Sequence, residues 1–148
     1  IQEGDVEKVR KGLGMPFSMH GKVVKGYQEG KKLGYPTANL AVAAEKIVPA
    51  EGVYATKVSI LDATYDAMTY IGRRPTMHNG NDCSIETNIF GFNGNLYGQD
   101  IAISFIARLR DDIRFNSHEA LKAKLANDEQ AAKKALATYK DEDDTHHV

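Results

Sequence analysis

The segment 26–40 (GYQEGKKLGYPTANL) holds the residues of this chain whose types and spacing are best suited to chemistry. Its three glycines recur at every fourth position, and glycine lets backbone N–H groups come close to a ligand. Two lysines add positive charge, while Thr37 and Asn39 supply hard oxygens of the kind that Mg²⁺ prefers. The pattern favours a phosphate site with a metal, and the alternative is an ordinary glycine-rich turn. The glycines and lysines are Gly26, Gly30, Gly34, Lys31 and Lys32.

This segment matches neither of the common phosphate-binding motifs. A Walker A loop ends in Gly-Lys-Ser/Thr and opens a helix, whereas Pro36 disfavours a helix at Tyr35. A dinucleotide-binding fingerprint requires Gly-x-Gly-x-x-Gly, which the sequence lacks. Any phosphate site here must therefore belong to another architecture.

Composition limits the classes of function. The 148 residues suffice for one domain with a core, and the formal net charge of −1 gives no general attraction to nucleic acid or anionic membranes. The single cysteine, Cys83, rules out an internal disulfide framework and fits a cytoplasmic protein. The sequence has no apolar run near the ~20 residues needed to cross a bilayer, and its histidines lack metal-ligand spacing.

The elements that must position these residues are mainly strands. Alternating apolar and β-branched residues predict strands at 17–24, 52–60, 64–71, 84–92 and 99–109. We expect a polar, mobile loop at 73–83 and a tight hairpin at Asn93-Gly94. The order of elements, strands first and helix last, argues for an antiparallel barrel or sheet with helical decoration.

Two helical regions are expected at the ends of the chain. Residues 2–13 can form a short helix with Asp5 as its N-cap. A longer helix is predicted from residue 117 onward, with a capping box of Asn116 and Glu119. Asn127 with Gln130 can restart it as a second helix, and the acidic residues 141–144 are most simply a solvated end.

The loop and strands together resemble the riboflavin kinase family along nearly the whole chain. The matching segments, in order, are GKVVKG at 21–26, LGYPTANL at 33–40, GVY at 52–54, IGRRPT at 71–76, ET at 86–87, LYG at 96–98 and 109–115. Residues 4–17 also resemble the segment that joins the two domains of bacterial bifunctional riboflavin kinase/FAD synthetases. We therefore expect a linker at 1–15, a kinase domain at 16–140 and an acidic tail at 141–148, with an adenylyltransferase domain preceding Ile1.

The resemblance implies a six-stranded antiparallel Greek-key β-barrel with a C-terminal helical segment. It also implies an ATP-dependent kinase that converts riboflavin to FMN, with ATP and riboflavin as partners and Mg²⁺ as cofactor. Thr37 and Asn39 match the metal-binding pair, although the same residues could form a turn in which Asn39 bonds its own backbone. Glu86 matches the catalytic glutamate, whereas a mid-strand carboxylate read alone usually faces solvent.

The resemblance further divides the remaining site residues between the two substrates. Ile89 and Tyr97 could instead pack the barrel, Arg110 could be a solvated charge and Phe115 a helix-entry contact. Arg74 and Met77 depart from the family pattern, which leaves their loop's contacts open. The nucleotide set is Gly26, Lys31, Lys32, Gly34, Pro36, Thr37, Asn39, Ile89, Gly91 and Tyr97, and the flavin set is Glu86, Arg110, Ile113 and Phe115.

Two other classes of function compete with the kinase. A non-catalytic flavin- or nucleotide-binding barrel would not need Thr37, Asn39 and Glu86 together. A nucleic-acid-binding barrel would need a basic face with aromatic side chains, and the sequence shows no clear basic stripe. The kinase is therefore the preferred interpretation.

Overall fold

A computed structural model describes residues 6, 12, 16–24, 38–41, 48–76, 80–92, 96–111 and 118–146. At 73–76, 80–83, 118, 121–122 and 140–146 it describes the backbone alone. Of the helix expected at 2–13, only Val6 and Gly12 are described, both in helical conformation.

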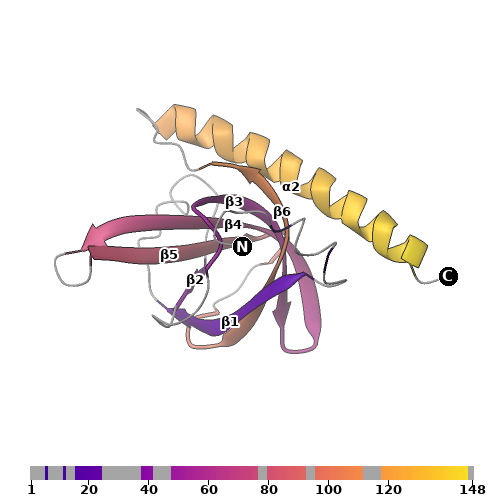
Figure 1. Ribbon diagram of the computed structural model, residues 1–148, viewed down its shortest axis with the longest axis horizontal. Coiled ribbons are helices and arrows are strands. Elements are labelled where there is room, and N and C mark those ends of the chain that lie inside the picture. The colour runs from indigo at the N-terminus through magenta and orange to yellow at the C-terminus, as the bar shows by residue number, and fades with distance from the viewer. Residues whose placement is uncertain are drawn as a thin grey trace.

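The described chain forms a closed antiparallel barrel of six strands in the order β1-β2-β5-β4-β3-β6 (Figure 1). The chain links β2 to β3 and β5 to β6, which are not neighbours in the barrel. This arrangement confirms the expected six-stranded barrel with a C-terminal helix. The elements are β1 (Phe17–Val24), β2 (Ala38–Leu40), β3 (Gly52–Ile60), β4 (Ala63–Thr76), β5 (Gly80–Ile89), β6 (Asp100–Arg110) and α2 (His118–His146).

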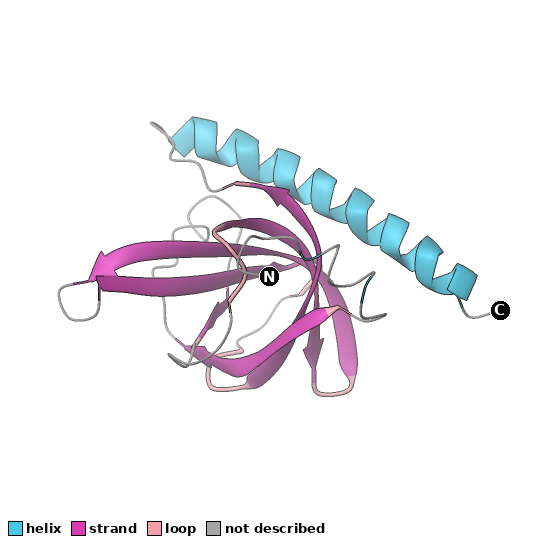
Figure 2. Ribbon diagram, in the orientation of Figure 1, coloured by secondary structure: helices cyan, strands magenta, loops and turns pink. Residues whose placement is uncertain are grey.

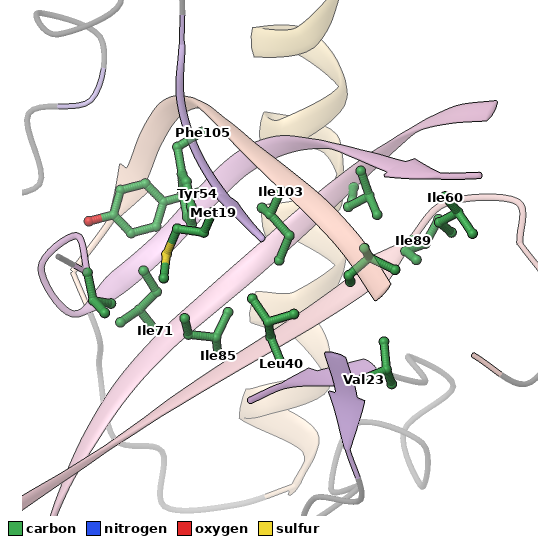
Figure 3. Close-up of a cluster of buried hydrophobic side chains, with 14 of the residues drawn as sticks. Met19, Val23, Leu40, Tyr54, Ile60, Ile71, Ile85, Ile89, Ile103 and Phe105 are labelled. Atoms are coloured by element: carbon green, nitrogen blue, oxygen red, sulfur yellow. The ribbon is translucent and has the colours of Figure 1, made fainter. Parts of the chain in front are cut away.

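Alternate residues of the strands fill the barrel interior. Figure 3 shows side chains from several strands converging there, including Tyr54, Phe105 and Leu40. The rings of Tyr54 and Phe105 meet edge to face, with centroids 5.3 Å apart and planes at 88°. Such a contact adds about 0.5–1.5 kcal/mol beyond the area that it buries. The interior is therefore a packed core that fixes the strands relative to one another.

A second core lies between the outer face of the barrel and α2, which runs diagonally across β3, β4 and β6 (Figures 1 and 2). Leu125, Ala132 and Leu136 repeat at helical spacing and supply the apolar side of α2. They pack against Met68 of β4 and other small or apolar side chains, so the helix covers one outer face of the barrel.

Three details differ from the expectations. Residues 73–76 belong to β4 and 80–83 to β5, paired from Arg73 with Cys83 to Thr76 with Gly80, so a loop at 73–83 is wrong. This hairpin extends beyond the barrel (Figure 1), and its strands are defined by backbone pairing, which does not require an apolar alternation in the sequence. The expected restart at Asn127 is also wrong, because α2 is continuous, and it runs on through 141–146 of the acidic segment. The Asn93-Gly94 hairpin lies outside the described residues.

Two irregularities in the β3–β6 pairing redirect the end of β6. Val53 pairs with Arg110 and Tyr54 with Arg108, which leaves Leu109 as an extra residue. A similar shift follows Ala55 and leaves Ile106 extra. Such bulges change the face on which the following side chains emerge. As a result Ile106, Ala107 and Leu109 all lie toward the helix, while Arg108 points toward Tyr54.

Candidate active site

The short strand β2 places Asn39 directly opposite Glu86 of β5. Residues paired in this way in an antiparallel sheet project to the same face, with Cβ atoms about 4.5–5.5 Å apart. The neighbouring pairs are Ala38 with Thr87 and Leu40 with Ile85. A carboxylate and a carboxamide that are nearly fifty residues apart in sequence are therefore cross-strand neighbours.

Both side chains emerge on the outer face of the barrel. Their neighbours Leu40, Ile85 and Thr87 are buried in the interior, as Figure 3 shows for Leu40 and Ile85, so alternation sends Asn39 and Glu86 outward. Asn39 retains 8% of its exposure, whereas Glu86 is half-buried. The pair thus combines an outward direction with partial shielding from water, which strengthens electrostatic interactions.

The same register continues round the barrel. Glu86 also pairs with Tyr70 of β4, Tyr70 pairs with Val53 of β3, and Val53 pairs with Arg110 of β6. On the other side, Asn39 pairs with Val24 at the end of β1. One row of residues across all six strands therefore includes the predicted metal ligand, the predicted base and a predicted flavin residue.

Three buried threonines stabilise the strands beneath this row. The hydroxyl of Thr69 lies 2.8 Å from that of Thr56 and 3.0 Å from that of Thr87. The side chains come from β3, β4 and β5, and all three residues are essentially inaccessible to water. Thr87 directly follows Glu86, so this hydroxyl chain anchors the strand segment that carries the carboxylate.

Arg110 is bound to α2 by a buried, two-pronged ion pair. Its Nε and Nη2 atoms donate to the two carboxylate oxygens of Asp128 at 2.9 and 2.8 Å. The exposed fractions of the two side chains are 11% and 4%. Nη1 donates to the carbonyl of Asp111 at 3.0 Å. The guanidinium is therefore held in a fixed plane, and it is not a solvated charge.

A second arginine, Arg108, lies beside Tyr54 of the barrel core. Arg108 donates through Nη2 to the carbonyl of Glu51 at 2.6 Å and forms an ion pair with Asp111 at 2.8 Å. Gly52 lies against this guanidinium, since a Cβ there would come within 3.2 Å of the Arg108 Nε and within 2.6 Å of the Arg110 carbonyl. Burial raises the pKa of the nearby Tyr54 hydroxyl, and the Arg108 charge opposes that shift in part. The Tyr54 hydroxyl donates to the Ala50 carbonyl at 2.6 Å.

The predicted nucleotide-binding residues that the structure describes lie in different environments. Ile89 lies in the barrel core (Figure 3), which fits the packing alternative for its side chain. Tyr97 is 63% exposed and precedes Gly98, whose N–H donates to the Val23 carbonyl at 2.9 Å. Tyr97 therefore does not pack the barrel interior, and most of its side chain lies at the surface near the end of β1. Gly91 follows β5 with a positive φ of 72°.

Several predicted site residues lie outside the described residues, and their placement stays a prediction. They come from the glycine-rich loop and from the β6–α2 connection. They are Gly26, Lys31, Lys32, Gly34, Pro36, Thr37, Ile113 and Phe115. The side chain of Arg74 and all of Met77 also lie outside the described part of the chain.

Sequence reasoning missed Asp128. Asn88, two residues along β5 from Glu86, is buried on the same outer face, and nothing in the structure gives it a part in the site. Asp128 follows Leu125 by three residues in the apolar repeat of α2. A carboxylate at a position expected to be buried was the available signal, because buried charges require partners.

No group of three or more His, Cys, Asp or Glu side chains that could hold a metal occurs among the described residues. Within that same part of the chain, no helix is long and apolar enough to cross a membrane. Mg²⁺ typically binds one or two protein oxygens, waters and substrate phosphates. The side-chain oxygens of Asn39 and Glu86, which are cross-strand neighbours, fit such a set.

Comparison with known proteins supplies the context for this geometry. The family model described as "Flavokinase: Riboflavin kinase" matches residues 13–136. A bifunctional riboflavin kinase/FMN adenylyltransferase of Bacillus subtilis is 37% identical over 134 residues, 89% of this chain and 42% of that protein. One from Listeria monocytogenes is 34% identical, over 95% of this chain and 45% of that protein. The chain thus spans less than half the length of these curated relatives.

Two solved structures share the fold. A crystal structure described as a macrolide-efflux protein from Streptococcus pneumoniae superposes with a TM-score of 0.85 at 36% identity, covering 90% of this chain and 43% of that one. The riboflavin kinase of Trypanosoma brucei superposes with a TM-score of 0.59 at 24% identity, covering 82% of this chain and 80% of that one. The second match supports the barrel architecture alone.

Proposed function

The chain belongs to the riboflavin kinase family, and we propose that it transfers the γ-phosphoryl group of ATP to the 5′-hydroxyl of riboflavin, giving FMN and ADP. The observation that supports this assignment most directly is the cross-strand pair of Asn39 and Glu86. Phosphoryl transfer depends on positioning and on neutralising phosphate charge, with one group to orient the nucleophile. The pair supplies an oxygen ligand and a proton acceptor side by side.

Glu86 acts as the general base in this proposal. Its carboxylate accepts the proton of the riboflavin 5′-hydroxyl as that oxygen forms its bond to the γ-phosphorus. The bond from the γ-phosphorus to the bridging oxygen breaks at the same time, and ADP leaves with that electron pair. The outward direction of Glu86 supports the role, because a carboxylate pointing into the barrel core could not reach a substrate.

Asn39 would hold Mg²⁺ through its side-chain oxygen, and Thr37 is its predicted partner. When bound, the ion would neutralise charge on the ATP phosphates. The structure describes Asn39 as a mostly buried residue on a strand, which keeps its amide in a defined direction. Thr37 precedes β2 by one residue, and its role rests on the family resemblance.

The two substrates would approach Asn39 and Glu86 from opposite ends of the row. Tyr97 and Gly91 are the described candidates on the nucleotide side, together with the predicted loop residues from Gly26 to Pro36. On the flavin side, Arg110 lies at the far end of the row, on β6 beneath α2. The predicted contacts of Ile113 and Phe115 would extend this side.

One incubation tests the proposal. The chain is mixed with riboflavin and Mg-ATP, and the products are separated; we expect FMN and ADP in equal amounts. A non-catalytic flavin-binding barrel would retain riboflavin without producing either product. Omitting Mg²⁺ should abolish turnover, since the metal role is part of the same proposal.

The wider setting of the chain is a second proposal that rests on its relatives. Their names combine riboflavin kinase with FMN adenylyltransferase, and this chain matches less than half of their length. We infer that the kinase works with an adenylyltransferase domain in a cytoplasmic protein. The 148-residue chain alone should then form FMN but no FAD, a result that mass spectrometry of the same reaction would reveal.

A further inference from the structure

Asp128 occupies an unusual position for a carboxylate. It lies three residues after Leu125 and four before Ala132, so it faces the barrel with the apolar side of α2. Among the side chains whose burial the structure describes, Asp128 is the only charged one that is buried. Burying a carboxylate is costly unless it is paired, and here both oxygens accept hydrogen bonds from Arg110.

The apolar contacts of α2 leave its exact placement weakly specified. Between the large side chains of Leu125 and Leu136 the buried apolar position is Ala132, with Ala135 partly buried, and these small residues interlock little with the sheet, so that Tyr139 beyond Leu136 is the next large contact. A two-pronged arginine–carboxylate pair is directional and fixes geometry as well as adding energy. A slip of one helical turn, about 5.4 Å, would separate the two groups completely.

A buried ion pair of this kind contributes little net stability compared with apolar residues of the same size. Its best-supported use is to fix register or orientation. What it fixes here is the guanidinium of Arg110, whose position in the row leads through Val53 and Tyr70 to Glu86. The pair therefore connects the helix to the row of residues that carries the candidate catalytic base.

We propose that Asp128 is a positioning residue for riboflavin: by binding both Nε and Nη2 of Arg110, it fixes the guanidinium and the docked helix relative to Glu86. This inference rests on the proposed kinase function. It assigns Asp128 no contact with either substrate. Its effect should appear on the flavin side, because Asn39 and the end of β1, near which Tyr97 lies, are at the other end of the row.

The test measures FMN formation while riboflavin and ATP are varied separately. Asp128→Asn keeps the size of the side chain and removes its charge. We expect the KM for riboflavin to rise about tenfold, since small misplacements of a binding group are costly, while the KM for ATP stays within about twofold. The matched control is Glu129→Gln, which removes the neighbouring carboxylate of an exposed pair with Lys133 and should change neither KM.

A double-mutant cycle shows whether Asp128 acts through Arg110. Arg110→Lys is combined with Asp128→Asn, and the double variant should be no worse for riboflavin than the more impaired single variant. Effects that add would contradict the proposal, because they would mean that the two residues act separately. Equal rises in the KM for both substrates would also contradict it.

A second variant covers the case in which Asp128→Asn does not fold. Asp128→Glu keeps the charge but displaces the carboxylate by one methylene, so we expect a folded protein with a raised KM for riboflavin. A folded variant with the wild-type KM would overturn the proposal. If the wild-type chain forms no FMN, the kinase assignment itself fails. If the wild-type chain forms FMN and the Asp128 variants keep its KM for riboflavin, only the role of Asp128 fails.

Discussion

Asn39 and Glu86 are direct cross-strand partners on β2 and β5, facing outward from a barrel whose interior is closed by their neighbours. The relationship depends on a strand of only three residues, Ala38–Leu40, inserted between β1 and β5. If that strand shifted by one residue, Asn39 would turn into the core and Leu40 would turn outward. The buried Leu40 therefore secures the direction of Asn39, so that packing in the barrel fixes the geometry of the site.

Replacing Asn39 should weaken the use of Mg²⁺. In Asn39→Ala the proposed oxygen ligand is lost, and we expect the Mg²⁺ concentration for half-maximal FMN formation to rise at least about tenfold. Titrating Mg²⁺ at saturating ATP and riboflavin measures this. Asn88→Ala is the matched control, since Asn88 is equally buried on the same face. A Mg²⁺ dependence shifted alike in both variants would remove Asn39 from the metal role.

Tyr54 should make the protein less stable at alkaline pH. Burial raises the pKa of its hydroxyl above the ordinary value of 10.0, so the folded state holds this proton more tightly than the unfolded state. The stabilising effect is complete below the unfolded pKa and is lost as pH rises through the folded one. Urea unfolding at about pH 8 and about pH 10.5 should show a falling free energy of unfolding.

The contribution of Tyr54 can be isolated with Tyr54→Phe. This variant keeps the ring against Phe105 but has no hydroxyl to titrate. Its free energy of unfolding should be lower at neutral pH, because the bond to the Ala50 carbonyl is gone, and should fall less steeply above pH 10.0. An identical alkaline slope in both proteins would show that another group controls the effect.

The threonine chain inside the barrel should respond unevenly to mutation. Thr69→Val removes the central hydroxyl, so the buried hydroxyls of Thr56 and Thr87 each lose their hydrogen bond to it. We expect the free energy of unfolding to fall by about 1–3 kcal/mol. Replacing Thr56, Thr69 and Thr87 together by Val leaves none of these hydroxyls buried without a partner, so the triple variant should lose less free energy of unfolding than Thr69→Val alone. Chemical denaturation compares the two, with exposed Thr64→Val as the control. A triple variant less stable than Thr69→Val would refute the argument.

The sequence predicts those strands of the barrel in which one face is buried in the interior. Residues 17–24 and 52–60 match β1 and β3, because the alternation of their side chains reflects the packed interior. The short β2 was not visible as a pattern, since three residues carry too little periodicity. It became interpretable through the family resemblance of 33–40, which also directed attention to Glu86.

Other features could not be predicted because they depend on contacts between distant segments. The bulges at Ile106 and Leu109 break strict alternation, and they send Arg108 toward Tyr54. The hairpin arms at 73–76 and 80–83 are extended by backbone pairing without an apolar pattern. The role of Asp128 emerges only when α2 docks on β6, since nothing in its local sequence identifies Arg110 as its partner.

The most direct test of the account is the turnover of Glu86→Gln measured beside its affinity for riboflavin. The change removes the proposed proton acceptor while keeping size and hydrogen bonding, so we expect FMN formation to fall by about 10²–10⁴ while riboflavin still binds. Asp66→Asn, which removes an outward carboxylate of β4 paired with Lys57, should leave turnover unchanged. Near-normal FMN formation by Glu86→Gln would contradict the central claim that the Asn39–Glu86 pair forms the catalytic site.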